Sequence, residues 1–248
     1  MDLELTGRVV FISGSHRGTG EGIAKVLARE GAHVLVHGFT GDEPERVVAE
    51  IRAAGGRADG VFGDITTDEG ASRAVHEVQG AAAAVDVLVN NYGVAEGPGW
   101  LDGSTRDWLA IYEKNVLSAV RLTQAFVPGM RARGFGRVIF VGTIGSSRPA
   151  ARMPHYYASK AALPNMTVSL AKELARSGVT VNLVSPGLIA TREVRERFSE
   201  ERLRENPSGV VCTPEDVGHL VAYLASPLSS SVNGANLRID GGSADCVN

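Results

Sequence analysis

Residues 8–27 read RVVFISGSHRGTGEGIAKVL, a β-branched and aromatic run that passes through a glycine-rich turn into an amphipathic pattern. The pattern predicts a strand over 8–13, a tight turn containing Gly14, Gly18 and Gly20, and a helix through 23–27. Such a turn lets backbone N–H groups approach a pyrophosphate, and the helix N-terminus adds a partial positive charge. The spacing is Gly-x-x-x-Gly-x-Gly, not the commoner Gly-x-Gly-x-x-Gly, so a plain flexible loop stays open as the alternative.

The same alternation of strand and helix patterns continues along the chain. Further strands are predicted over 33–37, 57–62, 86–89, 137–142, 180–185 and 235–240, with helices over 43–54, 69–81, 107–133, around 156–160 and over 215–225. No linker-like tract or internal repeat divides the chain. We therefore expect an α/β fold in which residues 1–248 form a single domain, a doubly wound (Rossmann) parallel sheet with helices on both faces.

Composition restricts the kinds of partner. Hydrophobic residues make up 44% of the 248 residues and charged residues 21%, with a net charge of -3 and no dense Lys/Arg cluster. These values predict a folded protein that binds a small molecule and no nucleic acid. No run approaches the ~20 apolar residues of a membrane span, and no apolar signal segment opens the chain, so we expect a cytoplasmic protein without a membrane partner. Cys212 and Cys246 match no metal-ligand spacing, so no metal is expected.

The carboxyl ends of the predicted strands carry the polar and glycine-rich positions. Gly14, Asp64, Asn90, Thr143 and Pro186 all follow directly on a strand. In an open parallel sheet, ligands bind outside these ends. One crevice is therefore expected to collect these residues.

Tyr156 and Lys160 lie four residues apart inside a predicted helix and so share one face. A phenol has a reference pKa of ~10, and a fixed cation beside it favours the phenolate. Such a pair can move a proton on and off an alcohol. Tyr157 lies three residues before Lys160 and could share the face, so spacing does not decide between the tyrosines.

Five motifs occur in order across essentially the whole chain: Ser13-Gly14-x-x-x-Gly18-x-Gly20, Asn90-Asn91-Tyr92-Gly93, Lys114-Asn115-Val116, Tyr156-x-Ala158-Ser159-Lys160 and Pro186-Gly187-x-x-x-Thr191. With them the chain resembles the short-chain dehydrogenase/reductases, and most of all the 3-oxoacyl-(acyl-carrier-protein) reductases. The resemblance implies about seven parallel strands and hydride transfer between a nicotinamide and a ketone or secondary alcohol. It also implies that the Tyr-x-x-x-Lys pair is Tyr156 and Lys160.

The resemblance implies four catalytic residues. Tyr156 would exchange a proton with the carbonyl oxygen. Lys160 would hold the nicotinamide ribose and lower the tyrosine pKa. Asn115 would anchor a water that links the lysine to solvent. Thr143 stands where the family usually has a serine that binds the substrate oxygen; it has the same hydroxyl donor and acceptor but an extra methyl group.

The implied dinucleotide site is larger. Its members are Gly14, Ser15, His16, Arg17, Gly18, Gly20, Thr40, Asp64, Ile65, Asn91, Gly93, Tyr156, Lys160, Pro186, Gly187, Ile189 and Thr191. The second strand ends His37-Gly38-Phe39-Thr40, without the acid that binds the ribose 2′-OH of NAD. Arg17 resembles the basic residue that contacts the 2′-phosphate. NADP is therefore the preferred cofactor, with NAD as the alternative.

The substrate class stays open at this level. A carrier-protein substrate would need a basic surface, which Arg148, Arg152, Arg192 and Arg195 could supply, although intervening glutamates dilute it. The alternatives are a small cyclic, sugar or steroid-like alcohol, or a non-catalytic dinucleotide-binding sensor, which Thr143 would explain. Residues 188–213 are expected to form a substrate-binding lid, although the Arg- and Glu-rich run 190–205 could be simply a solvated helix face. The resemblance further implies a homotetramer.

Overall fold

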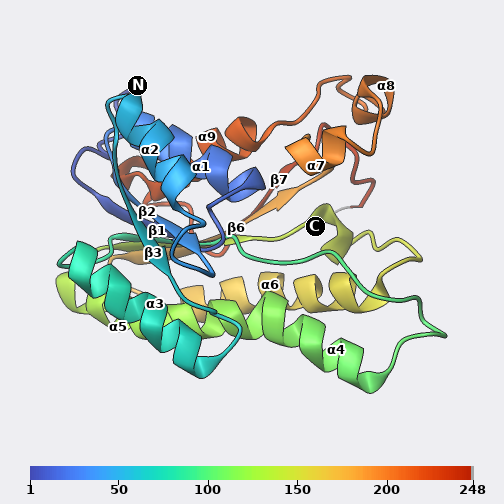
Figure 1. The fold of residues 1–248 in the computed structure, drawn as a ribbon, viewed down its shortest axis with the longest axis horizontal. Helices are drawn as coiled ribbons and strands as arrows, with labels where there is room; N and C mark the ends of the chain where they lie inside the picture. Colours follow the sequence, from blue (N-terminus) through green and yellow to red (C-terminus); the bar gives the residue numbers. More distant parts are fainter. Residues whose placement is uncertain (247–248) are drawn as a thin grey trace.

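The computed structural model describes residues 1–246 and contains one sheet of seven parallel strands in the order β3-β2-β1-β4-β5-β6-β7 (Figure 1). The strands are β1 Val9–Ile12, β2 His33–Gly38, β3 Arg57–Phe62, β4 Val87–Asn90, β5 Gly136–Val141, β6 Val179–Pro186 and β7 Asn236–Ile239. Every predicted strand end lies within one residue of these bounds. The predicted fold class, a doubly wound parallel sheet, is confirmed.

Helices cover both faces of the sheet (Figure 1). One layer contains α1 Gly18–Arg29, α2 Glu45–Ala53 and α9 Pro214–Ala225. The other contains α3 Asp68–Ala81, α4 Thr105–Tyr112, α5 Ser118–Arg133 and α6 Pro154–Glu173. Each layer closes its own apolar core, the first around Ile23, Leu27 and Val221, the second around Phe11, Leu122 and Phe140. Because both faces are covered, the central strands are buried along almost their whole length and mostly apolar.

The strand order reverses at β1, which pairs with β2 on one side and β4 on the other. The loops that follow β1 and β4 must therefore separate to opposite faces and leave a crevice at the carboxyl edge of the sheet. This places the glycine-rich turn after Ile12 beside the segment after Asn90. The sheet topology thus positions the site.

Helix α1 begins at Gly18, five residues before the predicted start. The reason is close packing against α9. A Cβ on Gly22 would lie 2.3 Å from the Pro214 side chain, so glycine at this point lets the two helices touch. A glycine-rich stretch that looked like loop is therefore the first turn of a buried helix.

The long helix predicted over 107–133 is present as an unbroken helical run over 105–133, but the run is not α-helical throughout. The segment consists of α4, a π-helical turn over Glu113–Leu117 and α5. A π turn adds one residue to a helical turn, which apolar periodicity over the whole segment does not reveal. The turn carries Asn115.

The Arg- and Glu-rich run 190–205 is not one helix. It forms two short helices, α7 Arg192–Arg195 and α8 Glu200–Leu203. Thr191 and Ser199 cap them, each hydroxyl accepting a hydrogen bond from a backbone N–H three residues on. None of the helices described within residues 1–246 is long and apolar enough to cross a bilayer.

Candidate active site

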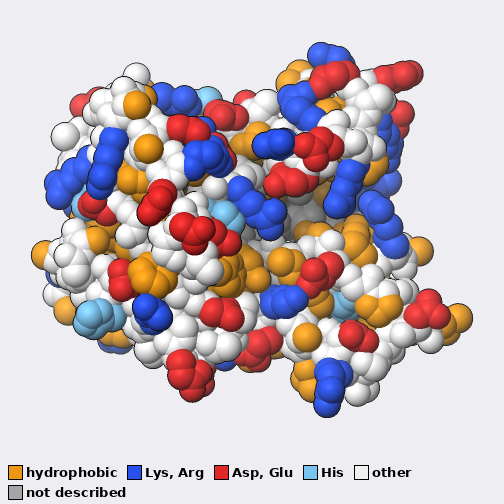
Figure 2. Space-filling view, viewed as in Figure 1, with side chains coloured by type: hydrophobic (Ala, Val, Ile, Leu, Met, Phe, Trp, Pro, Cys, Tyr) orange, Lys and Arg blue, Asp and Glu red, His pale blue; other side chains and the backbone are white. Residues whose placement is uncertain are grey.

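Two cavities meet at the carboxyl edge of the sheet. A cleft of about 1070 Å³ runs from the glycine-rich turn to Lys160, and a pocket of about 540 Å³ lies beside it, lined by Ile144, Met153 and Leu188 among others. Thr143 and Tyr156 line both. Figure 2 shows the molecule hollowed between the part that carries α7 and α8 and the part that carries α4. A long ligand in the cleft and a short one in the pocket would meet at these two hydroxyls.

Glycine backbone forms the floor of the cleft, at positions where a side chain would collide with a neighbouring residue. A Cβ on Gly20 would lie 2.6 Å from Asn91 Nδ2, and one on Gly93 would lie 2.6 Å from Lys160 Nζ. Gly14 and Gly18 have φ values of 63° and 58°, in the region that favours glycine. The turn is therefore an open cradle at the N-terminus of α1, which fits the pyrophosphate of a dinucleotide.

A buried histidine, which sequence reasoning missed, holds the glycine-rich turn. The Gly14 N–H donates to His37 Nδ1 at 3.0 Å, so Nε2 carries the proton and donates to the Gly63 carbonyl at 3.0 Å. Burial lowers the pKa of His37 to about 4. The imidazole is therefore neutral, in one tautomer, and joins the ends of three strands.

Most of the predicted dinucleotide-binding residues line the cleft. These are Gly14, His16, Arg17, Gly18, Gly20, Asn91, Gly93, Tyr156, Lys160, Pro186, Gly187, Ile189 and Thr191. Four others are not among its lining residues. Ser15 and Ile65 are fully buried, and Thr40 and Asp64 are exposed beside the cleft. Their roles stay predictions.

The expectation that no acid stands at the end of β2 is wrong. Glu43 folds back from the β2–α2 loop, and its Oε2 accepts hydrogen bonds from the backbone N–H of Phe39 and, at 3.2 Å, of Thr40. Gly38 makes room, because a Cβ there would lie 2.7 Å from Glu43 Cβ. A carboxylate thus lies where the ribose end of a dinucleotide would reach. The sequence alone does not reveal this contact, because Glu43 reaches the Phe39 and Thr40 N–H groups only through the turn between β2 and α2.

Arg17 lines the same cleft as that carboxylate. Its guanidinium is 3.5 Å from Glu193 of α7, and the two side chains are 66% and 45% exposed. An ion pair this exposed is weak. An anion that binds Arg17 more tightly than Glu193 does could therefore displace Glu193 as its partner.

Asn115 joins three elements. Its Oδ1 accepts from the Val94 N–H at 2.7 Å, while Nδ2 donates to the Val94 carbonyl and to Ser159 Oγ, both at 3.0 Å. The π turn presents the side chain inward, and only 1% of the residue is exposed. Asn115 therefore fixes the segment after β4 against α6.

Lys160 is buried in the floor of the cleft. Nζ donates to the Val141 carbonyl at 3.0 Å, at the end of β5. Loss of water around the ammonium lowers its pKa to about 8. The group is still mostly protonated at neutral pH, and an ammonium with spare donors beside the cleft fits hydroxyl groups of a ribose.

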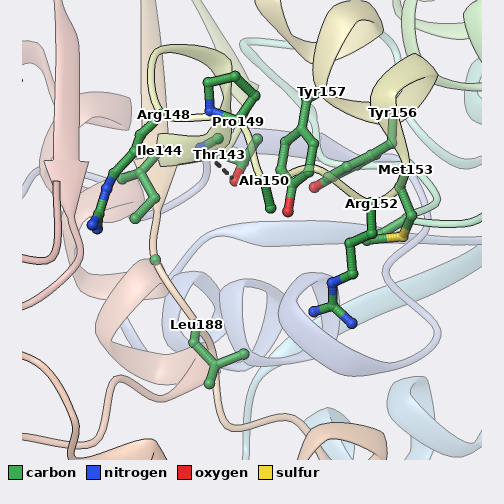
Figure 3. Close-up of a pocket in the computed structure, with 13 residues that line it drawn as sticks. Thr143, Ile144, Arg148, Pro149, Ala150, Arg152, Met153, Tyr156, Tyr157 and Leu188 are labelled. Atoms are coloured by element: carbon green, nitrogen blue, oxygen red, sulfur yellow. Dashed lines mark hydrogen bonds between the residues drawn. The ribbon is translucent and has the colours of Figure 1, made fainter. Parts of the chain in front are cut away.

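Tyr156 and Tyr157 form an edge-on pair with ring centroids 5.0 Å apart, and both hydroxyls point into the pocket (Figure 3). Tyr157 lines the pocket alone, whereas Tyr156 lines the pocket and the cleft. Only Tyr156 therefore stands between the two cavities, as the family pattern implies.

The expectation that the Tyr156 pKa is lowered is wrong in direction. Burial raises the pKa of the phenol, and a hydrogen bond with the Thr143 side chain offsets this in part. The four-residue spacing predicts that Lys160 lies near Tyr156, but it does not predict that the phenol is buried. The consequence is a neutral phenol at pH 7, which is the form that can donate a proton.

Thr143 lies two residues after the end of β5, and it lines both cavities. Its Oγ1 accepts from the Gly145 N–H at 3.1 Å and so caps the short turn Ile144–Ser146. The hydroxyl proton stays available for Tyr156 or a ligand oxygen. Ser146 donates to the Thr143 carbonyl and Ser147 to the Ile144 carbonyl, so neither hydroxyl replaces that of Thr143.

A profile of the family described as Enoyl-(Acyl carrier protein) reductase matches residues 14–244. The chain is 31% identical to the 3-oxoacyl-[acyl-carrier-protein] reductase FabG of Aquifex aeolicus, over 98% of this chain and 99% of that one. The chain belongs to the short-chain dehydrogenase/reductase family. It is also 34% identical to the 7alpha-hydroxysteroid dehydrogenase of Clostridium sardiniense, over 97% and 94% of the two chains.

Among solved structures, the chain resembles L-sorbose reductase from Gluconobacter frateurii complexed with NADPH and L-sorbose. The TM-score is 0.92, with 30% identity over 100% of both chains. As a short-chain dehydrogenase/reductase, this protein is an NAD(P)-dependent oxidoreductase of carbonyl and alcohol groups.

Proposed function

We propose that this short-chain dehydrogenase/reductase reduces a small ketone to a secondary alcohol with NADPH. The observation that carries the proposal is the position of Tyr156, a neutral phenol on the wall shared by the cleft and the pocket. Burial keeps this phenol protonated at neutral pH, so it holds the proton that a carbonyl oxygen needs during reduction. A carbonyl oxygen at this wall would face both Tyr156 and Thr143.

Each residue has a separate task in the proposed reaction. The bound nicotinamide would supply a hydride to the carbonyl carbon. Tyr156 gives its proton to the carbonyl oxygen, and the Thr143 hydroxyl orients that oxygen. Lys160 binds the ribose hydroxyls and, with its positive charge, stabilises the phenolate that remains. Asn115 holds Val94 and Ser159 in place and so keeps the cleft wall beside Lys160 rigid.

NADP is the preferred cofactor in this proposal. Arg17 supports it, because the guanidinium lines the cleft and its ion pair with Glu193 is exposed. The NADPH in the related L-sorbose reductase is also consistent with this choice. Glu43 opposes it, because a carboxylate on the Phe39 and Thr40 N–H groups repels a 2′-phosphate.

A free small ketone is the first candidate substrate. Three of the four arginines that could attract an acidic carrier protein are paired with carboxylates: Arg148 with Asp245, Arg192 with Glu196, and Arg195 with Glu200. A 3-oxoacyl carrier-protein substrate is the second candidate, favoured by the similarity to the Aquifex aeolicus reductase.

The proposal also covers the lid, the cellular location and the oligomeric state of the enzyme. Residues 188–213 act as a lid, supported by Val194 and Arg197, which line the cleft from this segment. The enzyme works in the cytoplasm, which the free thiols of Cys212 and Cys246 support. It assembles as a homotetramer, supported by exposed apolar side chains on α4 and α6.

Transfer of deuterium tests the reaction directly. The purified protein is incubated with NADPH deuterated at C4 of the nicotinamide and with a panel of cyclic ketones, ketoses, oxosteroids and 3-oxoacyl thioesters. The proposal predicts an alcohol one mass unit heavier for at least one ketone. Tight NADPH binding without label in any product, and without change in Tyr156→Phe, would instead support a non-catalytic sensor.

A further inference from the structure

We infer that the substrate pocket binds a ketone that carries a carboxylate, and that Arg152 is the residue that binds this group. The inference rests on the proposed reduction of a ketone at Tyr156 and names the chemical class of its substrate. Its basis is the charge of the pocket lining and the pairing of each charged group within it.

The pocket lining contains two positive charges and no negative one. Arg148 and Arg152 are its charged members, and no Asp or Glu is among its thirteen residues. Most of the remaining wall is apolar, for example Ile144, Met153 and Leu188. The Arg152 residue is exposed, so the apolar wall beside it strengthens its attraction for an anion only moderately over that in water. The volume of about 540 Å³ limits the ligand to a small molecule or one end of a larger one.

Arg148 is already occupied. Its Nε lies 2.9 Å from Asp245 Oδ1, and its NH1 donates to the Ser243 carbonyl at 2.5 Å. Both partners belong to the segment after β7, so Arg148 fastens that segment to the loop beside the pocket. Its guanidinium therefore already has a carboxylate partner within the protein, in an exposed ion pair.

Arg152 has no such partner. Within residues 1–246 its guanidinium makes no hydrogen bond or ion pair, whereas Arg148, Arg192 and Arg195 each do. Figure 3 shows Arg152 on the same side of the pocket as the Tyr156 and Tyr157 hydroxyls, with Arg148 on the opposite side. The residue lies just before Met153, whose φ of 53° turns the chain into α6 and toward Tyr156.

The geometry of the group favours a carboxylate. A guanidinium presents parallel N–H donors that match the two oxygens of a planar carboxylate. With the carbonyl oxygen held at Tyr156 and Thr143, the carboxylate would extend along the same wall to Arg152. A neutral ketone would leave water as the only partner of this exposed charge.

The test compares oxo acids with their neutral derivatives. Initial rates with NADPH are measured for 2-, 3- and 4-oxo carboxylic acids, their methyl esters and their primary amides, using the wild type, Arg152→Gln and Arg152→Lys. We expect the wild-type KM of at least one acid to be about 10- to 100-fold below that of its ester. In Arg152→Gln this difference disappears because KM rises for the acid and not for the ester, and Arg152→Lys restores part of it.

Arg192→Gln is the matched control, since Arg192 is 90% exposed and pairs only with Glu196 among the described residues. It should keep the wild-type preference for the acid. Two results would overturn the assignment of Arg152: neutral esters or amides that are turned over as well as their acids, or a preference for the acid that survives in Arg152→Gln. Either result would leave the proposed ketone reduction intact. Absence of turnover with every ketone would overturn both.

Discussion

At the residue scale, Lys160 shows how a functional group can oppose stability. Burial lowers its folded pKa to about 8 from a usual 10.5, so the folded protein holds this proton less tightly than the unfolded chain does. Below pH 8 the lysine is charged in both states, and folding carries the cost of desolvation. As pH rises from 8 to 10.5, the unfolded chain binds more protons and this cost disappears.

Lys160→Met should therefore stabilise the protein while abolishing catalysis. We expect an increase of about 1–3 kcal/mol in the free energy of unfolding at pH 7, partly offset by loss of the hydrogen bond to Val141. Urea unfolding followed by circular dichroism across pH 7 to 10.5 measures it. The advantage of the variant over the wild type should shrink as pH rises; a variant less stable at every pH would contradict the account.

Glu43 offers a residue-scale test of cofactor preference. In Glu43→Gln the side chain can still accept hydrogen bonds from the Phe39 and Thr40 N–H groups, but the negative charge is gone. We expect the affinity for NADPH to rise about 10-fold relative to NADH. Titration of both dinucleotides by fluorescence measures the ratio, with Glu45→Gln, which changes an exposed acid in the first turn of α2, as control. An unchanged ratio would show that Glu43 does not face the 2′ position.

At the element scale, the π turn between α4 and α5 positions Asn115. Asn115→Ala removes the partners of the Val94 N–H and carbonyl groups. We expect a loss of about 1–3 kcal/mol in unfolding free energy and a lower kcat with little change in KM for the ketone. Asn182→Ala is the matched control, since Asn182 bonds Val232 and Ala235 in the same way. Val232 and Ala235 line neither cavity, whereas Val94, the partner of Asn115, lines the cleft.

The control variant should lose similar stability and keep its kcat. If Asn115→Ala and Asn182→Ala lost stability alike and both kept full kcat, the role of Asn115 would be structural only.

Elements also show what a sequence can and cannot predict. Strand positions followed from buried runs such as 33–37 and 180–185, because period and β-branching are local properties. The π turn could not be predicted in this way, because one extra residue in a helical turn leaves the composition of the segment unchanged. The division of 190–205 into two helices could not be predicted either, because a single serine cap is enough to begin a new helix. The position of Glu43 beside the end of β2 and the burial of Tyr156 both depend on tertiary packing. Motifs in the sequence therefore identify candidate site residues, but they do not predict the protonation states of those residues.

At the scale of the whole molecule, apolar side chains remain on the helical layer formed by α4, α5 and α6. Leu109 is 71% exposed, Tyr112 43% and Val168 41%. Burying such residues between copies of the chain would stabilise an oligomer by ~25 cal/mol per Å². The proposed tetramer should therefore use this face.

Light scattering after size exclusion tests the assembly. We expect a mass about four times the 26.1 kDa of one chain, and a smaller species for Val168→Glu, which adds a charge to this face. Glu173→Gln is a mild control on the same helix. A wild-type mass of 26.1 kDa at micromolar concentration would exclude a stable oligomer.

The central claim is that Tyr156, not Tyr157, delivers the proton between the two cavities. Single-turnover oxidation of NADPH with an accepted ketone, compared between Tyr156→Phe and Tyr157→Phe, tests it most directly. The account predicts a rate reduced about 10²- to 10⁴-fold in Tyr156→Phe with NADPH binding unchanged, and a near wild-type rate in Tyr157→Phe. A Tyr156→Phe variant that turns over at the wild-type rate would contradict it.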